Sequence, residues 1–423
     1  MLYEMFFYPA IVIGLFTTTF FLMTFFEDFG REKRRPDYQP KVTVCVPTWN
    51  DAETIANTIQ SLLNLDYPKE KLEIIVVENN GSTDGTLEVA RKFESQGVRV
   101  FSIKEGGKGF AMNFAIKQAN GEIFGALDSD SIVAPDALKN MVPLFSEEKV
   151  AAVTPTLKVN NPKGMWHYIQ SVEYIYGVFL RKVFALLDSI HVTPGPFTLY
   201  RIDFFRKHGG YDIDNITEDM EVALRIQSVK LRIENAIDAN VYTTAPNDFV
   251  SLFKQRTRWY LGLLDNVPRY KHLFSPEYGI LGLFILPLSF YSIFFAIAML
   301  FYQSYIFATT GLKQLSIFNA VNFDVIGLAS ANPPAFYLAP NIFTAMSVIV
   351  LAMGIIAFYL ALRYSKDSFK PFLSYIIYYP FYLIVFALWW LSAIYCKLFA
   401  KELRFGGVVW RNSLRNKLLH DSA

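Results

Sequence analysis

The chain of 423 residues contains only two cysteines, Cys45 and Cys396, which lie far apart in the sequence. A disulfide framework or a cysteine-based zinc cluster needs more cysteines at closer spacing, so both are excluded. The formal net charge is also small, at +2. Because a protein that binds nucleic acid mainly through phosphate contacts relies on many basic side chains, the composition predicts no nucleic-acid partner.

The first apolar run, residues 6–26, has about the length that spans a bilayer. It lacks the basic leading segment and the small-residue cleavage site of a secretory signal peptide. Residues 1–30 are therefore predicted to form a transmembrane anchor. Residues 31–35 carry four basic side chains, which favour the cytoplasmic side. The sequence thus predicts an integral protein of the cell membrane whose middle domain is cytoplasmic.

Three more apolar runs, at 279–303, 340–363 and 371–396, predict transmembrane helices across residues 278–400. None carries a central ionisable residue of the kind that transport sites use, which disfavours a transporter. Three crossings from the cytoplasm would put the C-terminus outside, whereas the basic tail, residues 401–423, favours the inside. Either the stretch 304–339 hides a further crossing, or one run, such as the last with its Pro380, does not cross fully.

Residues 38–245 alternate between short apolar runs and segments with helical spacing. The runs expected as strands are 42–47, 72–77, 98–103, 123–127 and 150–154, and the helical segments between or after them are 52–64, 84–94, 108–118 and 135–145. This alternation predicts βαβ units, a mostly parallel sheet and hence an α/β fold. Two longer helical segments follow at 166–188 and 250–275. The second is amphipathic and basic, so residues 246–277 are expected at the membrane surface.

The run 123–127 ends in Asp128-Ser129-Asp130. Ligands of open parallel sheets bind at the carboxyl ends of the strands. Two carboxylates with a hydroxyl between them suit a hard divalent cation, and such a cation suits a diphosphate. Asp-Ser-Asp is also good turn chemistry, which is the favoured interpretation of the motif in isolation. Its position after a fourth apolar strand weakens that interpretation.

Other polar segments are expected around the same edge of the sheet, and each is a weak signal alone. Glu78 and Asp84 also fit a strand-end carboxylate and a helix cap. The segment 106–109 is Gly-Gly-Lys-Gly but lacks the spacing of a P-loop. Glu218-Asp219 also fits a solvated helix start, and Gln255-Arg-Thr-Arg-Trp259 one face of a basic helix. The full set is Pro47–Asp51, Glu78–Gly85, Gly106–Asn113, Asp128–Asp130, Thr193–Pro196, Thr217–Asp219 and Gln255–Trp259.

In this order and spacing, these segments resemble glycosyltransferase family 2. They look most like its membrane-embedded synthase branch, which includes cellulose, hyaluronan and poly-N-acetylglucosamine synthases. The resemblance covers about residues 40–265, and its most specific part is the series Asp-x-Asp, Thr-Glu-Asp and Gln-x-x-Arg-Trp. It implies a GT-A nucleotide-sugar-binding fold for residues 38–245. Where many relatives have Asp-Asp-Gly-Ser, this chain has Glu78-Asn-Asn-Gly-Ser82, which leaves the nucleotide open between uracil and guanine.

The resemblance implies a role for each matched residue. Asp219 would be the general base that deprotonates the acceptor hydroxyl, with Glu218 as the alternative. Asp130 would ligate Mn²⁺ or Mg²⁺, and Asp128 would bind the metal or the ribose. Trp259 would offer its ring to the acceptor sugar. The residues expected to contact or support the nucleotide sugar are Pro47, Asp51, Glu78, Asp84, Lys108, Asn113, Asp128, Ser129, Gly195, Gln255 and Arg258.

The chain shows no second carboxylate placed to form a covalent glycosyl-enzyme, which together with the resemblance implies inversion at the anomeric carbon. Polymer-extruding relatives generally use more transmembrane helices than the four predicted here. The expected activity is therefore transfer of a hexose from GDP-mannose or a UDP-hexose to a membrane-held acceptor such as a lipid-linked glycan. A processive polysaccharide synthase, with oligomerisation supplying further helices, is the alternative. A non-catalytic membrane scaffold is the second alternative, and the oligomeric state is left open.

Overall fold

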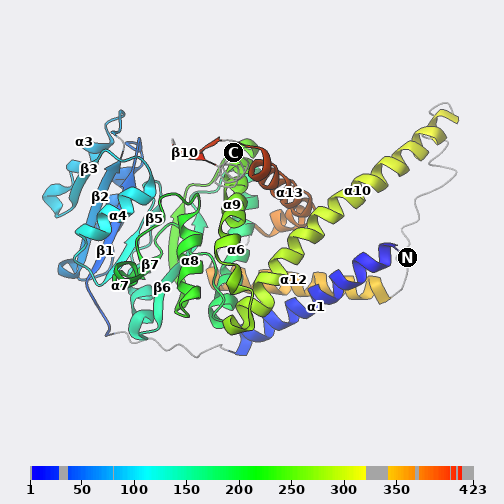
Figure 1. Cartoon of the computed structure of the whole chain (residues 1–423), viewed down its shortest axis with the longest axis horizontal. Helices are drawn as coiled ribbons and strands as arrows, with labels where there is room; N and C mark the ends of the chain where they lie inside the picture. Colours follow the sequence, from blue (N-terminus) through cyan, green and yellow to red (C-terminus); the bar gives the residue numbers. More distant parts are fainter. Residues whose placement is uncertain are drawn as a thin grey trace, which may run out of the picture.

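An eight-stranded sheet forms the centre of the middle domain, in the order β3-β2-β1-β4-β7-β6-β8-β5. The computed structural model (Figure 1) describes residues 2–27, 37–79, 81–320, 342–366, 371–400, 402–405 and 408–411. The strands of this sheet are β1 (Val42–Thr48), β2 (Leu72–Asn79), β3 (Arg99–Ile103), β4 (Ile123–Ala126), β5 (Ile132–Val133), β6 (Val150–Val159), β7 (Leu199–Arg201) and β8 (Arg232–Thr243).

The sheet is parallel in the half that the sequence predicts best. The pairs β1–β2, β1–β4, β2–β3 and β6–β8 are parallel, whereas β4–β7, β6–β7 and β5–β8 are antiparallel. The pairing of Val46 with Val76 and of Cys45 with Ala126 aligns β1, β2 and β4, so their carboxyl ends share one edge. This is the edge at which the sequence predicts the site.

Several strands differ from the prediction. The strand β6 continues to Val159, past Pro155, because a register irregularity between Thr154 and Thr156 accommodates the proline. The strand β2 continues through Glu78, which pairs with Ser102 of β3, so Glu78 lies inside the strand and not after it. The strands β7 and β8 were not predicted, because neither forms a continuous apolar run.

Helices cover both faces of the sheet. They are α2 (Ile55–Leu63), α3 (Thr86–Arg91), α4 (Lys108–Gln118), α5 (Ala137–Met141), α7 (Ile202–His208) and α8 (Glu218–Ser228). One core contains Val44 of β1 and Ile59 of α2, and the other contains Cys45 of β1 and Met112 of α4. Successive β1 side chains thus alternate between two buried faces, as expected for a covered parallel sheet. The predicted helices at 84–94 and 135–145 are shorter, and both continue as 3₁₀ turns.

Two long helices join the sheet to the apolar helices. The helix α6 (Gly164–Leu186) packs against β6 and β8 and also against α1, α12 and α13. The helix α9 (Phe249–Arg269) packs against α8 and α13. It contains Pro268 near its end and is followed by 3₁₀ turns, so it stops short of the predicted residue 275. In Figure 1, α6 and α9 stand between the sheet and the apolar helices.

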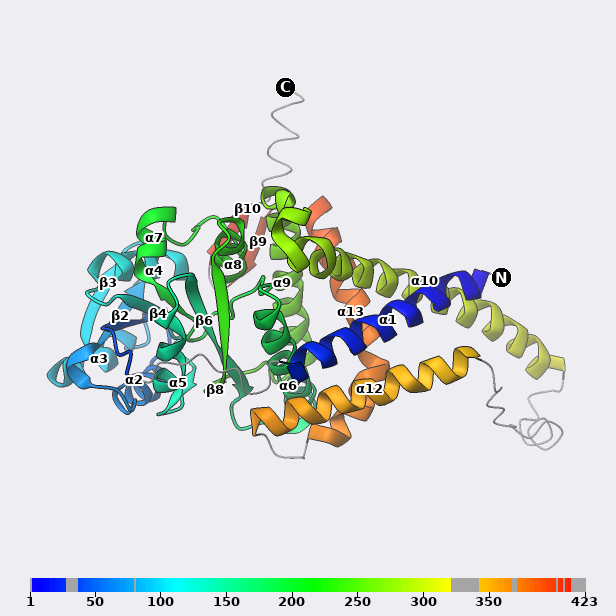
Figure 2. The same ribbon diagram turned by 90° about the horizontal axis from the view of Figure 1, so that it is seen from below.

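The predicted apolar runs form α1 (Leu2–Glu27), α10 (Leu286–Ala320), α12 (Ile342–Ser365) and α13 (Pro371–Phe399). Segments Phe7–Glu27, Leu281–Lys313 and Thr344–Ser365 are long and apolar enough to cross a membrane, while Ile384–Phe399 of α13 is shorter. Figure 2 shows α1 running beside α12, and the two helices are in contact.

The number of membrane crossings stays a prediction. Residues 31–35, 321–341 and 412–423, on which the topology argument also depends, lie outside the described residues. The described part of the tail adds a two-stranded antiparallel sheet of β9 (Glu402–Phe405) and β10 (Val408–Arg411).

Candidate active site

A cleft of about 2300 Å³ borders the carboxyl ends of β1 and β4 and continues between α1, α6, α9 and α10. Most of the predicted site residues line it, namely Pro47, Asp51, Lys108, Asp128, Ser129, Asp130, Gly195, Glu218, Asp219, Gln255, Arg258 and Trp259. The fold therefore brings together segments separated by more than two hundred positions in the sequence. Glu78, Asp84 and Asn113 lie outside the described lining of this cleft.

Asp51 is held at the end of β1 by three hydrogen bonds to one carboxylate oxygen. Its Oδ2 accepts from the Thr48 hydroxyl at 2.9 Å, the Trp49 N–H at 2.8 Å and the Ser129 hydroxyl at 2.6 Å. Within the described part of the chain, no group donates to Oδ1. Asp51 is thus fixed in orientation, with its second oxygen left for a ligand, and Ser129 ties this strand end to the Asp128–Asp130 segment.

Glu78 is buried, with an exposed fraction of 1%. Its Oε1 accepts from the Ser82 N–H at 2.5 Å, and its Oε2 accepts from the Ser102 hydroxyl at 2.6 Å. Both oxygens thus brace the loop after β2, and each keeps a lone pair for a further donor. Recognition of the nucleotide base by Glu78 stays a prediction.

Asp84 organises the same loop. Its Oδ1 accepts from the hydroxyl and N–H of Thr86, and its Oδ2 accepts from the Ala52 N–H at 3.0 Å. The Thr86 hydroxyl, followed by the Ala52 N–H, lowers the pKa of Asp84 because both stabilise the ionised carboxylate. Asp84 therefore links the start of α3 to the segment after β1, and its contact with ribose or diphosphate stays a prediction.

Asn113 has a similar bracing position. Its Nδ2 donates to the Tyr211 carbonyl at 2.9 Å, and its Oδ1 accepts from the Tyr211 N–H at 2.7 Å. Both ends of this amide are therefore used to join α4 to the chain at Tyr211. The predicted contribution of Asn113 to donor binding stays a prediction.

Lys108, at the first position of α4, faces two carboxylates. Its Nζ lies 2.5 Å from Asp128 Oδ1 and 3.8 Å from Glu218 Oε1. Burial alone would lower the pKa of Lys108, but Asp128 and Glu218 outweigh it and the pKa is raised. Lys108 is therefore cationic at neutral pH and links the Asp128 segment to the start of α8.

Gly195 lies between these groups. A Cβ atom at this position would meet Lys108 Nζ at 3.0 Å, Asp219 Oδ2 at 3.8 Å and Asp128 Oδ2 at 3.9 Å. The absence of a side chain therefore keeps open the space that the ammonium and the two carboxylates border. A reacting group that entered this space would touch all three side chains.

Asp130 carries one side-chain hydrogen bond, from the Ser131 hydroxyl at 3.2 Å. Burial, followed by the nearby charge of Asp128, raises the pKa of Asp130 to about 6. This crowding of negative charge is what a divalent cation relieves. Among the described residues, no group of three or more His, Cys, Asp or Glu side chains gathers as a metal site. A cation here would therefore need oxygens from the substrate or water as further ligands.

Asp219 lies in the first turn of α8, where its Oδ1 accepts from the Met220 N–H at 2.8 Å. Its backbone carbonyl accepts from the Thr193 hydroxyl at 2.6 Å, and that hydroxyl accepts from the Tyr200 hydroxyl at 2.9 Å. Burial, followed by the charge of Glu218, raises the pKa of Asp219 to about 6, although Lys108 and Arg258 oppose the shift. A buried carboxylate with a pKa near neutrality has the properties of a general base.

The Gln-x-x-Arg-Trp segment lies on α9. Within this segment, Arg256 makes the strongest contacts with the rest of the protein. Arg256 is fully buried and donates to Glu173 Oε2 of α6 at 2.6 Å and to Gln255 Oε1 at 2.5 Å. Its guanidinium carbon lies 4.0 Å from the centre of the Trp259 ring. The sequence predicts no role for Arg256, because a basic residue on an amphipathic helix gives no sign that it will be buried. Arg256 joins α9 to α6 and holds Gln255 and Trp259 at the cleft.

Replacing Arg256 with Ala should destabilise the protein by about 3 kcal/mol, because it would leave the Glu173 carboxylate without its buried partner. Thermal unfolding of the purified protein would measure this as a lowered midpoint. Arg206→Ala is the matched control, since Arg206 forms an exposed pair with Asp203 and such pairs contribute about 0–1 kcal/mol. Equal midpoints for the two variants would contradict the role given to Arg256.

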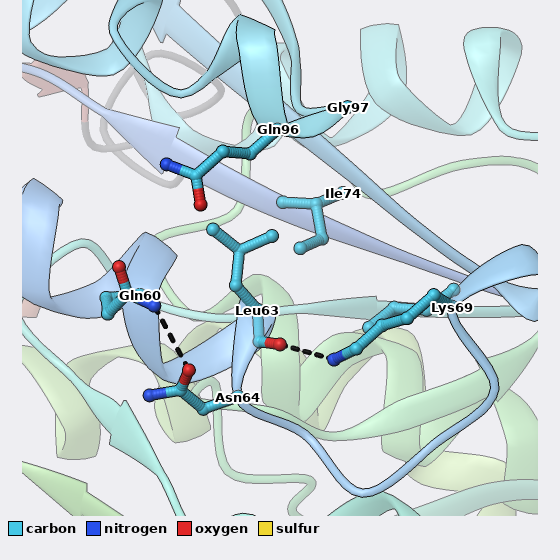
Figure 3. Close-up of a pocket in the computed structure, with 8 residues that line it drawn as sticks. Gln60, Leu63, Asn64, Lys69, Ile74, Gln96 and Gly97 are labelled. Carbon is cyan, nitrogen blue, oxygen red and sulfur yellow. Dashed lines mark hydrogen bonds between the residues drawn. The ribbon is translucent and has the colours of Figure 1, made fainter.

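A second, smaller pocket of about 340 Å³ lies between α2, β2 and the turn at Gln96 and Gly97 (Figure 3). Lys69 Nζ donates to the Leu63 and Leu65 carbonyls, and Gln60 Nε2 donates to Asn64 Oδ1 at 3.0 Å. Lys69 thus satisfies carbonyls at the end of α2, which is a common structural role for lysine. No carboxylate, histidine or cysteine lines this pocket in the described part of the chain, and we assign it no chemistry.

The sheet, the covering helices and the cleft at the strand ends are arranged as in the GT-A fold. A mannosyltransferase from Pyrobaculum calidifontis, solved with GDP-Man and Mn²⁺, aligns with a TM-score of 0.54 and 21% identity. The alignment covers 82% of this chain and 97% of that one. At this identity the likeness establishes the fold alone, which confirms the predicted fold class.

The family model described as "Glycosyltransferase like family 2" matches residues 40–262. The chain therefore belongs to glycosyltransferase family 2, as the motifs predicted. Poly-β-1,6-N-acetyl-D-glucosamine synthase of Staphylococcus epidermidis is 32% identical over 226 residues, and that of Staphylococcus aureus (strain COL) is 33% identical over 226 residues. Each alignment covers 52% of this chain and 54% of the relative, so the chain matches about half the length of these curated proteins.

Proposed function

We propose that this chain is a membrane-bound, inverting glycosyltransferase that moves a hexose from GDP-mannose or a UDP-hexose to a membrane-held acceptor such as a lipid-linked glycan. The observation that carries the proposal is the continuity of the cleft. The same cavity borders Asp130 and Asp219 and extends to Gly14 of α1 and Ser292 of α10. An acceptor anchored beside these apolar helices would therefore reach the donor site without leaving the membrane surface. The catalytic domain would face the cytoplasm, where it meets nucleotide sugars.

The donor would occupy the part of the cleft at the strand ends. Asp51 would bind the nucleoside through its open oxygen, and Lys108 would approach the diphosphate. Two carboxylates, together with diphosphate oxygens and water, are a suitable set for Mg²⁺ or Mn²⁺, so Asp128 and Asp130 fit the predicted cation. Such a cation, when bound, would neutralise the charge that the leaving nucleoside diphosphate gains. Arg258 adds a further positive charge to the cleft, and a guanidinium can bind diphosphate oxygens with two parallel hydrogen bonds.

Asp219 would deprotonate the acceptor hydroxyl as that oxygen attacks the anomeric carbon from the side opposite the diphosphate. The Met220 N–H and the Thr193 hydroxyl hold the carboxylate and its backbone in place. The open space beside Gly195 would accept the reacting atoms between Asp219 and Asp128. Bond formation and departure of the diphosphate in one displacement invert the configuration at that carbon.

The pH profile should follow the titration of Asp219. A general base acts only when it is ionised, and the pKa of Asp219 is raised to about 6. We therefore expect kcat/KM to be constant above that value and to fall about tenfold per pH unit below it. Initial transfer rates between pH 4.5 and 8, at fixed ionic strength and saturating cation, would measure this. A profile that stays flat down to pH 5 would contradict the assignment.

A thermal-shift screen of UDP, GDP and their sugars, each with Mn²⁺, tests the proposed donor. A response to guanine nucleotides alone supports GDP-mannose, and a response to uracil nucleotides alone supports a UDP-hexose. No response, together with no hydrolysis or transfer from any nucleotide sugar, would instead support a non-catalytic membrane scaffold.

A processive polysaccharide synthase is a second candidate, because the curated relatives include poly-β-1,6-N-acetyl-D-glucosamine synthases. Product length separates the two activities. A single added sugar per acceptor, resolved by mass spectrometry, supports transfer to a lipid-linked glycan. A ladder of products from one donor would favour the synthase.

A further inference from the structure

Arg181 lies near the end of α6 and borders the cleft. It is not part of any of the sequence motifs that predict the active site. Its Nε and Nη2 atoms are buried and have no hydrogen-bond partner within the described part of the chain. The guanidinium lies over Gly177, one helical turn earlier, where a Cβ atom would meet Nη1 at 3.3 Å. Two donor nitrogens of a planar fork are thus withdrawn from water beside a cavity, with no acceptor among the described residues.

The charge of Arg181 is not balanced by a described carboxylate. Burial lowers the pKa of Arg181 to about 10, and the charge effect that opposes this shift comes from Tyr174. The side chain remains cationic at neutral pH, because that value lies well above 7. Arg256, a fully buried arginine at this junction, is paired with Glu173 instead. Since a buried, unpaired cation is costly, an anion supplied by a ligand would complete the Arg181 site.

Apolar side chains of α6 and of two helices expected in the membrane line part of the cleft that Arg181 borders. Ile13 of α1, Phe184 of α6 and Leu288 of α10 border the same cleft. From α6 the chain continues through residues 187–194 to Gly195, where an added Cβ would meet Lys108 Nζ, Asp128 and Asp219. A cation, an apolar groove and the proposed catalytic carboxylate therefore lie along one continuous cavity.

We propose that Arg181 binds the phosphate or diphosphate that links the acceptor glycan to its lipid. The inference rests on the proposed function and deepens it by naming the chemical class of the acceptor. The anionic linker would bind the guanidinium fork, the hydrocarbon chain would follow α1 and α10, and the glycan would extend toward Asp219. Arginine suits this role because its fork binds phosphate oxygens through two parallel hydrogen bonds.

Binding of farnesyl diphosphate to the full chain in neutral detergent tests the proposal directly. The donor site is first saturated with Mn²⁺ and the nucleoside diphosphate that responds in the thermal-shift screen, so the probe cannot bind there. We expect the wild-type protein to bind farnesyl diphosphate and Arg181→Met to bind it about 10–100-fold more weakly. Isothermal titration calorimetry would measure both affinities.

Lys182→Met is the matched control, because Lys182 is the next residue of α6 and lies outside the described cleft lining. Its affinity should equal that of the wild type.

Two further probes separate the possible sources of the anion. Farnesol, which has the same chain without the charge, should bind the wild type and Arg181→Met equally weakly. Inorganic pyrophosphate should bind the wild type much more weakly than farnesyl diphosphate, because it lacks the chain. Equal affinity for inorganic pyrophosphate would overturn the lipid-linked acceptor, and equal affinity of Arg181→Met for farnesyl diphosphate would overturn the subsite.

The thermal midpoint of the ligand-free protein gives an independent readout. Removing an unpaired buried charge should leave the midpoint of Arg181→Met unchanged or raised, whereas an arginine with only a structural role would lower it. A lowered midpoint with unchanged probe binding would overturn the inference. The two proposals fail separately, because a missing nucleotide response contradicts the proposed function alone. A normal nucleotide response with unaltered farnesyl diphosphate binding in Arg181→Met contradicts the subsite alone.

Discussion

Replacing Asp219 with Asn should lower the transfer rate by about 10²–10⁴-fold, the range that a general base contributes. Asparagine has nearly the same shape and can still accept the Met220 N–H, so the start of α8 should keep its structure. The loss should appear in kcat, while the affinity for the nucleotide stays within about twofold. Steady-state transfer assays and nucleotide titrations on the same preparation would measure the two quantities.

Glu218→Gln is the control for this prediction, because Glu218 is the neighbouring carboxylate and the alternative base. Its oxygen lies 3.8 Å from Lys108 Nζ, so its expected contribution is to the charge around Lys108. We expect a smaller loss of rate for this variant than for Asp219→Asn. A nearly inactive Glu218→Gln beside an active Asp219→Asn would move the role of base to Glu218.

Replacing Asp130 with Asn should abolish the contribution of Mn²⁺ to nucleotide binding. Residues that hydrogen-bond to metal ligands contribute about 10–100-fold to metal affinity. Loss of a residue that binds the metal directly should therefore lower the affinity at least as much. The thermal shift produced by nucleotide with Mn²⁺ should therefore fall to that produced by nucleotide alone. Without ligands the variant should be at least as stable as the wild type, because the substitution removes the crowding of Asp130 against Asp128.

Asp66→Asn is a suitable control for Asp130→Asn. Asp66 also loses one negative charge in this variant, but it forms an exposed pair with Lys139 away from the cleft. Its response to Mn²⁺ and nucleotide should match the wild type. An undiminished Mn²⁺ response in Asp130→Asn would show that the cation does not depend on this carboxylate.

The parallel half of the sheet could be predicted from the sequence because β1, β2 and β4 are buried on both faces. Such strands are continuous apolar runs, and polar residues mark their ends. The strand β8 could not be predicted in this way, since residues such as Glu234, Asn235 and Asp238 interrupt its apolar positions. The strand β7 has only three residues, and its antiparallel pairing with β4 and β6 depends on contacts far away in the sequence.

The candidate site likewise contains residues whose positions could be predicted from local sequence pattern and residues whose positions could not. Asp51, Lys108 and Asp130 follow strands or open a helix, so their meeting at one edge follows from a parallel sheet. The placement of Asp219 beside Gly195 does not follow from local pattern, because α8 begins some ninety residues after β4. The resemblance supplied that expectation. Arg181 and Arg256 gave no sequence signal, because burial of a guanidinium is decided by how α6 packs against other helices.

The position of α6 has a consequence for which acceptors can react. One helix packs on one side against β6 and β8 and on the other against α1, α12 and α13. An α-helix is stiff over this length, and α12 also contacts β8 directly, so the sheet and the apolar helices are held at a fixed spacing. If the acceptor is lipid-linked, as we propose, the cleft should select acceptors by the distance between the lipid end and the reactive hydroxyl. Under the proposed function, a glycan that had gained one sugar would hold its new hydroxyl farther along the cleft, so geometry would stop addition after a defined step.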